Sequence, residues 1–431
     1  MDIRFETSMA GSREVSCRLQ QSGREGEPAA VRGSEQRVLT TFARTPWPRP
    51  DRHGILWLWV GVCGLHCFRR QSANQRWGKR MNGSEEIVPV RAAHRFDEQA
   101  LSDYLRKELE GFSGALTVRQ FGQGQSNPTF LLSAGGKEWV LRKKPPGKLL
   151  PSAHAVDREY RIIEALQQTD VPVPETCLLC EDDAIIGTPF YVMKRAVGRI
   201  FRDPTIPEAA RPEERSAVLD AMNETLAKLH RVDWEALGLA DYGKSGNYMA
   251  RQVDRLTRQY EASKTDEIES MESLIRWLSQ NIPDDDTTTI AHGDYRLENM
   301  VIHPTEPRVV AVLDWELSTL GHPLADLAYN CMLYHFPAGS GTYMGYAGLN
   351  LQALGIPSEE DYVAAYCVRT GRGAIPNWSF FLAFSIFRLA AILQGVYKRG
   401  LDGIASSDKA ESYGIRVRYL SDIGWKIACR G

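Results

Sequence analysis

Acidic residues and one asparagine lie on both sides of an apolar run within residues 291–316. Asp294 and Asn299 are separated by four residues, the spacing at which a phosphoryl-transfer loop places a base for the acceptor hydroxyl and an oxygen ligand for Mg²⁺. Asp314 follows the apolar residues 308–313, and a carboxylate at the end of a buried strand is costly unless it is paired or binds a metal. A hairpin of this length would return Asp314 beside Asn299. We therefore expect these two side chains to bind one Mg²⁺ and Asp294 to act as the base.

Phosphoryl transfer from a nucleotide also needs groups that hold its phosphates. The turn at 122–128 contains Gly124, Gln125, Ser126 and Asn127, whose backbone N–H groups and hydroxyl suit phosphate contacts. An ordinary hairpin turn explains the same residues equally well on local sequence alone. The downstream acidic motif favours the nucleotide-binding interpretation.

A cation and its acidic partner are the next requirement. Val140 and Arg142 alternate onto one face of a predicted strand, where Arg142 would bind the α- and β-phosphates. Glu159, on the following helix, would pair with Arg142, and Met193 ends a strand where adenine would meet backbone groups. Without the downstream motif, the charged residues of this set would be interpreted as ordinary surface charges.

Three further residues flank the predicted chemistry. His292 and Asp326 are expected to brace the loop that carries Asp294 through hydrogen bonds, and neither is assigned a catalytic role. Glu316 is interpreted either as a helper of the metal site or as a partner in a salt bridge only.

The spacing of apolar residues predicts an α+β fold, with a small antiparallel sheet followed by a mainly helical region. Asp97 is expected to cap a first helix. Strands are predicted at 115–121, 129–133, 138–143 and 190–194, with a helix at 157–168 between the last two. Helices are predicted at 213–232, 248–263, 268–280, 322–334, 359–369, 378–398 and 411–426. A sheet lobe and a helical lobe in this order favour a nucleotide cleft between them.

Composition narrows the class of protein. A formal net charge of −2 over 431 residues, without a basic or acidic C-terminal tail, argues against nucleic acid as the partner. The eight cysteines are scattered, which indicates a reducing intracellular compartment, with the cytoplasm as the default. Cys177 and Cys180 are interpreted as thiols on a strand rather than as a metal or redox site. Residues 378–396 are nearly all apolar, but Arg388 in their middle favours a buried helix over a membrane span.

Three segments are expected along the chain: an Arg-rich, poorly ordered leader at 1–85, a nucleotide-binding lobe at 86–195 and a catalytic and substrate lobe at 196–431. The leader contains an apolar run at 54–68, which is short for a membrane-spanning helix. It is compatible with a signal anchor, a transit segment or an alternative start without a fold of its own. The third interpretation is favoured because acidic residues interrupt the arginines.

The motifs resemble those of the aminoglycoside/choline-type phosphotransferase family, a branch of the protein-kinase-like fold. The first signature consists of His292, Gly293 and Asp294 with Asn299, followed by Asp314. A closer resemblance, to the kinase-like domain of acyl-CoA dehydrogenase family members ten and eleven, rests on GQSNPTF at 124–130, VLRKKPPG at 140–147, DREY at 157–160, GRIFR at 198–202, LDWELSTLGHPLADL at 313–327, PNW at 376–378 and QGVY at 394–397.

This resemblance implies a two-lobed small-molecule kinase that uses ATP and Mg²⁺. It further implies that the acceptor is the hydroxyl of a 4-hydroxyacyl-CoA in fatty or hydroxy acid catabolism, that an acyl-CoA dehydrogenase acts with the kinase, and that the compartment is mitochondrial or peroxisomal. Arg142 stands where the wider family has lysine, which fits the closer group. Two alternatives stay open: a kinase for an aminoglycoside- or choline-like amino alcohol, and an inactive nucleotide-binding scaffold.

Overall fold

The computed structural model describes residues 87–122, 127–145, 155–339, 344–402 and 410–430. All of them belong to one compact unit, Asn74–Gly431. The expected leader at 1–85 and the turn residues Gly124, Gln125 and Ser126 lie outside the described residues, so their assignments stay predictions.

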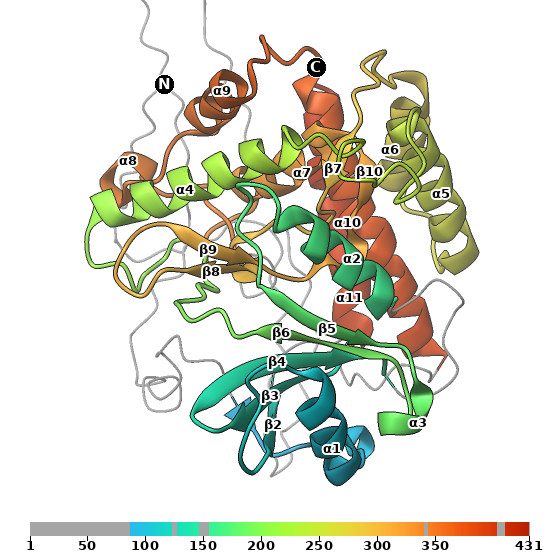
Figure 1. Ribbon diagram of the computed structural model, residues 1–431. Coiled ribbons are helices and arrows are strands. Elements are labelled where there is room, and N and C mark those ends of the chain that lie inside the picture. Colours follow the sequence, from blue (N-terminus) through green and yellow to red (C-terminus); the bar gives the residue numbers. More distant parts are fainter. Residues whose placement is uncertain (1–86, 123–126, 146–154, 340–343, 403–409, 431) are drawn as a thin grey trace, which may run out of the picture. The chain divides into compact units, whose positions relative to one another are not determined.

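Six antiparallel strands form the small sheet, in the order β1-β2-β3-β4-β6-β5 (Figure 1). Their bounds are β1 Ile87–Val88, β2 Thr117–Phe121, β3 Thr129–Ala134, β4 Lys137–Lys143, β5 Thr176–Cys180 and β6 Phe190–Lys194. The predicted antiparallel sheet is confirmed. The two-residue strand β1 was not expected, because so short a segment has no periodicity of its own.

Alternation along β4 divides its side chains between two packed faces. Trp139 and Leu141 lie in a cluster with Leu101 and Leu105 of α1 (Glu98–Glu108). Val140 lies in the larger core, which continues into the helices, and Arg142 shares this second face by strand period. The register of β4 therefore points Arg142 toward the helical part of the molecule.

Two helices cover the two faces of the sheet. α1 begins after Asp97, whose carboxylate accepts hydrogen bonds from the backbone N–H groups of Gln99 and Ala100 at 2.9 Å, as its predicted capping role requires. α2 (Val156–Leu166) packs on the other face against β5 and β6, and its Ile162 and Ile163 belong to the larger core. A short helix, α3 (Asp183–Ile186), joins β5 to β6.

Helices dominate the chain after β6. Their bounds are α4 Pro212–His230, α5 Tyr248–Ser263, α6 Glu269–Gln280, α7 Pro323–Cys331, α8 Leu351–Leu354, α9 Glu359–Thr370, α10 Trp378–Leu401 and α11 Ala410–Ala428. Three 3₁₀ turns accompany them within the described residues: η2 Leu297–Asn299, η3 Trp315–Leu317 and η4 Met332–His335; a further one, η1 Ala92–His94, precedes α1. The helix predicted at 322–334 ends at Cys331, where the chain tightens into η4. A boundary between lobes near residue 195 stays a prediction, because one core runs from the sheet into the helices.

Two short pairs of antiparallel strands lie among these helices. β7 (Thr289–Ala291) pairs with β10 (Thr319–Gly321), and β8 (Met300–Ile302) pairs with β9 (Val309–Val312). Together they carry the acidic stretch on which the functional prediction depends.

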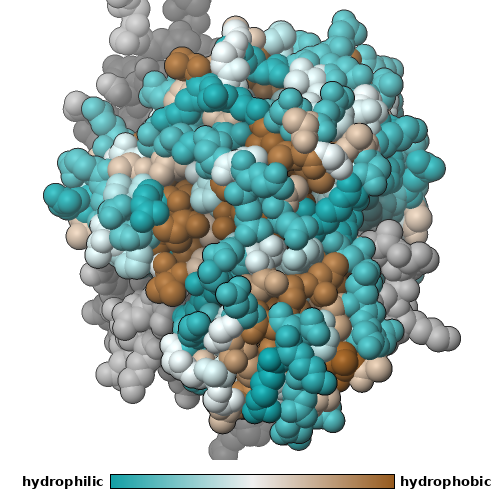
Figure 2. All heavy atoms as spheres, viewed as in Figure 1, coloured by the Kyte–Doolittle hydropathy of each residue, from teal (hydrophilic) through white to brown (hydrophobic). Residues whose placement is uncertain are grey.

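Of the helices that the structure describes, α10 is long and apolar enough to cross a membrane. However, 72% of the most apolar 18-residue stretch of α10 is buried inside the protein, where the helix packs against α11, α5 and α7. The outer face of the molecule shown in Figure 2 is a separate matter: it is largely hydrophilic, with separate hydrophobic patches. The burial of α10 is that expected of a core helix.

Candidate active site

A cleft of about 610 Å³ lies between the sheet and the helical part. It is lined by all predicted site residues within the described ranges except Glu159, which lies behind Arg142: Asn127, Val140, Arg142, Met193, Asp294, Asn299 and Asp314. Residues that are more than 180 positions apart in the sequence thus meet at one surface.

The predicted hairpin between Asn299 and Asp314 is confirmed. Met300 of β8 pairs with Val312 of β9, and the backbone N–H of Leu313 donates to the carbonyl of Asn299 at 2.8 Å. Asn299 and Asp314 therefore lie at the same open end of the hairpin.

Asp314 itself has a left-handed backbone, with φ 66° and ψ 58°. This conformation is uncommon for a residue other than glycine, and strained backbones of this kind cluster at functional sites. Next to it, Trp315 is buried, and its indole N–H donates to the carbonyl of Val312 at 2.9 Å. The ring of Trp315 also lies 4.7 Å from that of His292. Packing on both sides thus holds Asp314 in its conformation.

The loop that carries Asp294 is braced as expected. The backbone N–H groups of His292 and Gly293 donate to the carboxylate of Asp326 at 2.6 and 2.9 Å, and His292 Nε2 lies 2.9 Å from the carbonyl of Leu313. Burial opposes ionisation of Asp326, but the hydrogen bond from His230 and the neighbouring histidine and amide groups outweigh it and lower the pKa of Asp326. Asp326 therefore acts as a buried anion that shapes the loop.

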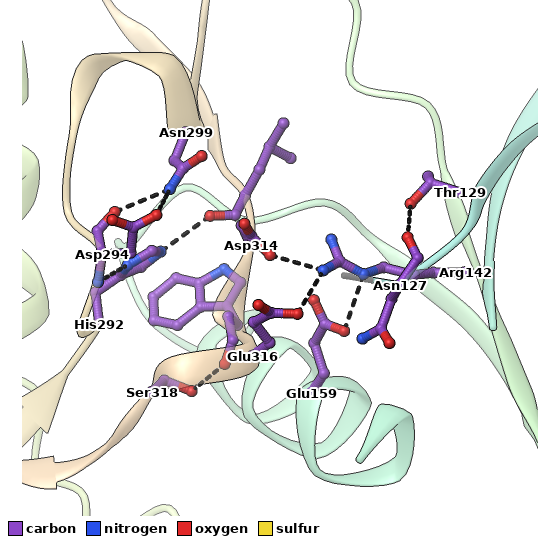
Figure 3. A network of polar contacts seen from close by, with 12 residues as sticks. Asn127, Thr129, Arg142, Glu159, His292, Asp294, Asn299, Asp314, Glu316 and Ser318 are labelled. Atoms are coloured by element: carbon purple, nitrogen blue, oxygen red, sulfur yellow. Dashed lines mark hydrogen bonds and ion pairs between the residues drawn. The ribbon is translucent and has the colours of Figure 1, made fainter. Parts of the chain in front are cut away.

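The carboxylate of Asp294 is held from two sides, and Figure 3 shows the contact with Asn299. The Tyr329 hydroxyl donates to Oδ1 at 2.8 Å, and the Asn299 amide donates to Oδ2 at 2.9 Å. Arg296 Nε also lies 3.2 Å from Oδ2. The contacts of Tyr329 and Arg296 were not predicted, although Tyr329 lies three residues after Asp326 and thus on the same face of α7.

Arg142 joins the sheet to α2 and to the hairpin at once (Figure 3). Its Nε lies 3.1 Å from Glu159 Oε2, while its Nη2 lies 2.6 Å from Asp314 Oδ1 and 3.4 Å from Glu316 Oε2. The predicted Arg142–Glu159 ion pair is therefore present, and Glu316 joins the same network.

These charges are arranged in a largely dry environment. Burial opposes charge on Arg142, but the attraction of Glu159 and Asp314 outweighs it and raises the pKa of Arg142. Burial raises the pKa of Glu159 to about 7, against the opposing attraction of Arg142, because Glu159 is 1% exposed and two other carboxylates are close. Glu159 thus depends on Arg142 for its negative charge.

The residues at the hairpin end fit a magnesium ion. Asp314 uses Oδ1 for Arg142, and its other oxygen has no hydrogen-bond partner within the described ranges. Asn299 donates through its amide nitrogen, which leaves its amide oxygen available as a ligand. The described residues contain no group of three or more His, Cys, Asp or Glu side chains that could hold a metal by themselves. Mg²⁺ is usually bound by one or two protein oxygens together with water and phosphate, and Asp314 and Asn299 can supply two such oxygens.

Val140 and Met193 are cross-strand neighbours and form an apolar part of the cleft wall. A flat aromatic base would be covered by such a surface. Asn127, the one predicted turn residue within the described ranges, lines the same cleft and is buried.

Comparison with known proteins places this geometry in context. Residues 117–366 match the model of the phosphotransferase enzyme family. The chain is 46% identical over 349 residues to mouse acyl-CoA dehydrogenase family member 10, covering 81% of this chain and 33% of the mouse protein. It is 48% identical over 352 residues to chicken acyl-CoA dehydrogenase family member 11, covering 79% of this chain and 44% of the chicken protein. The chain thus spans less than half the length of these curated relatives.

A solved structure with high sequence identity to this chain supports the fold. The crystal structure of a candidate aminoglycoside phosphotransferase from Ralstonia eutropha has a TM-score of 0.72 and 50% identity, covering 78% of this chain and 99% of that one. The two-lobed fold predicted from the motifs is confirmed.

Proposed function

Because the chain belongs to the phosphotransferase enzyme family, we propose that it transfers the γ-phosphoryl group of ATP to the hydroxyl of a small molecule. The observation that carries the proposal is the position of Asp294, whose carboxylate faces the cleft between Tyr329 and Asn299. A carboxylate oriented in this way can accept the proton of an acceptor hydroxyl as the phosphoryl group is transferred.

The other residues of the site would bind the metal ion and the nucleotide. Asn299 and Asp314 would hold Mg²⁺, which neutralises the charge of the phosphates when it is bound. Arg142 would bind the α- and β-phosphates, with Glu159 keeping its guanidinium in place. Val140 and Met193 would cover the adenine ring of ATP. Asn127 would contact the phosphates together with Gly124, Gln125 and Ser126.

For the acceptor we propose a 4-hydroxyacyl-CoA. Support comes from the names of the relatives, which are acyl-CoA dehydrogenase family members. An acyl-CoA dehydrogenase as partner, and a mitochondrial or peroxisomal site of action, belong to the same proposal. The similarity to the Ralstonia eutropha protein supports an amino sugar as the second candidate.

Mass spectrometry of the acceptor tests this choice. After incubation with ATP and Mg²⁺, 4-hydroxypentanoyl-CoA should gain the mass of one phosphoryl group, because its hydroxyl supplies the nucleophile. Pentanoyl-CoA, which differs only by that hydroxyl, serves as the control and should stay unchanged. Phosphorylation of choline or an amino sugar without any product from the acyl-CoA would assign the protein to the second candidate. No transfer to any acceptor would favour an inactive scaffold.

The Arg142–Glu159 pair makes a second testable prediction. Replacing either residue by alanine should raise the KM for ATP, since Glu159 acts only through Arg142. The double variant should be no worse than the worse single variant, with a coupling energy of about 1–3 kcal/mol in a double-mutant cycle.

A matched control is available on the same two segments of the chain. Lys144, just after β4, and Asp157 of α2 form a looser pair at 3.9 Å, with 28% and 50% of their side chains exposed. In a double-mutant cycle, the free-energy effects of Lys144→Ala and Asp157→Ala on ATP binding should add within about 0.5 kcal/mol. If the losses at Arg142 and Glu159 also add, Glu159 does not act through Arg142.

A further inference from the structure

Arg388 is a charged residue in the middle of an otherwise apolar core helix, α10. Its guanidinium Nη2 donates to the carbonyl of Gly293 at 2.6 Å and lies over the ring of Tyr329, 5.4 Å from the centroid. Within the described residues no carboxylate pairs with it. Because an unpaired charge beside a core is costly, its position next to the Asp294 loop calls for an explanation.

A second arginine, Arg255, lies on α5, which packs against α10 (Figure 1). Tyr248, Arg251 and Arg255 follow one another at helical spacing along one side of α5. Among the described residues Arg255 donates to the neutral Gln252 side chain, at 3.0 and 2.7 Å, and Arg251 donates to the carbonyl of Lys244. The Arg255 side chain is exposed, but neighbouring groups remove part of its hydration, and this desolvation, followed by repulsion from Arg388, lowers the pKa of Arg255. The guanidinium groups of Arg255 and Arg388 thus repel each other, and no acid among the described residues forms an ion pair with either.

Arg388 lies beside the base, because it contacts Gly293, the residue before Asp294, and the ring of Tyr329. The hydroxyl of the same Tyr329 donates to Asp294 Oδ1. In an in-line transfer the acceptor oxygen approaches the γ-phosphorus opposite the leaving ADP, with its proton next to the base. An acceptor whose hydroxyl meets Asp294 would therefore bind close to Arg388.

The nearest buried acid does not neutralise them. Asp326 is 1% exposed, and its oxygens already accept hydrogen bonds from the backbone of His292 and Gly293 and lie near His230. An incoming anion would therefore meet two unpaired guanidinium groups, which bind carboxylate and phosphate oxygens well.

We propose that Arg388 and Arg255 form an anion subsite for the acceptor, which binds a carboxylate or phosphate of the molecule whose hydroxyl is phosphorylated. The inference rests on the proposed function for the identity of the reaction, and it deepens that function by specifying an anionic rather than a cationic acceptor. A polyamine sugar would be repelled from the same position.

Binding measurements test the subsite without requiring turnover. Calorimetry compares two pairs of ligands that differ in one anionic group: 4-hydroxypentanoate with 4-hydroxypentanamide, and the 4-hydroxypentanoyl thioester of 4′-phosphopantetheine with that of pantetheine. The wild-type protein should bind the anionic member of at least one pair about tenfold more tightly. Arg255→Gln and Arg388→Gln should each reduce this preference to less than about twofold, and Arg388→Lys should restore part of it. Preference within the first pair identifies a carboxylate as the anion, and preference within the second identifies a phosphate.

Arg258→Gln is the matched control, because Arg258 lies on the same helix, carries the same charge and is paired with Asp254 with 74% of its side chain exposed. It should keep the full preference. The proposal is wrong if the wild-type protein shows no preference for anions, or if the preference survives in Arg255→Gln. Because Arg255 is exposed, that variant should fold normally even if Arg388→Gln lowers the melting temperature. Tight anion binding without any phosphoryl transfer would support the subsite and contradict the proposed reaction.

Discussion

Asp294→Asn should lower turnover on the order of a hundredfold or more, with little change in the affinity for ATP. The amide has nearly the same size and can still accept a hydrogen bond from Tyr329, so the loop should keep its conformation. What is lost is the ability to accept a proton from the acceptor hydroxyl in the transition state. A defect confined to that state lowers kcat rather than the binding of the nucleotide.

Single-turnover kinetics and ATP binding by calorimetry separate these two quantities. Asp241→Asn is a suitable control, since Asp241 has 75% of its side chain exposed and pairs with Arg161 away from the site. A variant that keeps more than about a tenth of the wild-type turnover would show that Asp294 is not the base. A loss of ATP affinity in proportion to the loss of kcat would instead assign Asp294 to nucleotide binding.

Asp314→Asn should have the second largest effect. The affinity for Mg²⁺-ATP should fall by roughly tenfold or more, which corresponds to a loss of about 1.4 kcal/mol in binding free energy, and turnover should fall strongly. The reason is the removal of one anionic oxygen from a site for a hard cation. Asparagine tolerates the left-handed conformation that Asp314 adopts, at φ 66°, so the substitution changes charge without adding backbone strain.

Titration of ATP at several Mg²⁺ concentrations checks this prediction. Asp314→Ala, compared with Asp314→Asn, should lower the melting temperature further, because alanine is less tolerant of the left-handed backbone. Unchanged affinity for Mg²⁺-ATP with persisting activity in Asp314→Asn would rule out Asp314 as a metal ligand.

Local chemistry made much of the fold predictable from the sequence. The Asp97 cap, the alternation along β4 and the hairpin that returns Asp314 to Asn299 each depend on residues close together in the chain. The pairing of Arg142 with Glu159 followed from strand and helix order, because a cation facing a helix in the core needs an acid there.

Contacts between segments that are distant in the chain were harder to predict from the sequence. β7 pairs with β10 and Arg388 contacts Gly293 across 95 positions, and neither contact leaves a local pattern. Tyr329 could have been suspected from its helical spacing to Asp326, but the side chain that it meets belongs to another loop. The turn residues Gly124, Gln125 and Ser126 lie outside the described residues, so their role still rests on the motif alone.

The guanidinium of Arg142 has a consequence for its replacement by lysine. Its Nε and Nη2 reach acids on opposite sides, Glu159 on α2 and Asp314 on the hairpin, and a single ammonium has no such fixed fork. Exchange of Arg142 for lysine would therefore leave one of the two acids short of a partner. We expect a lysine at this position to require a different arrangement of Glu159 and Asp314, in which one ammonium reaches both acids.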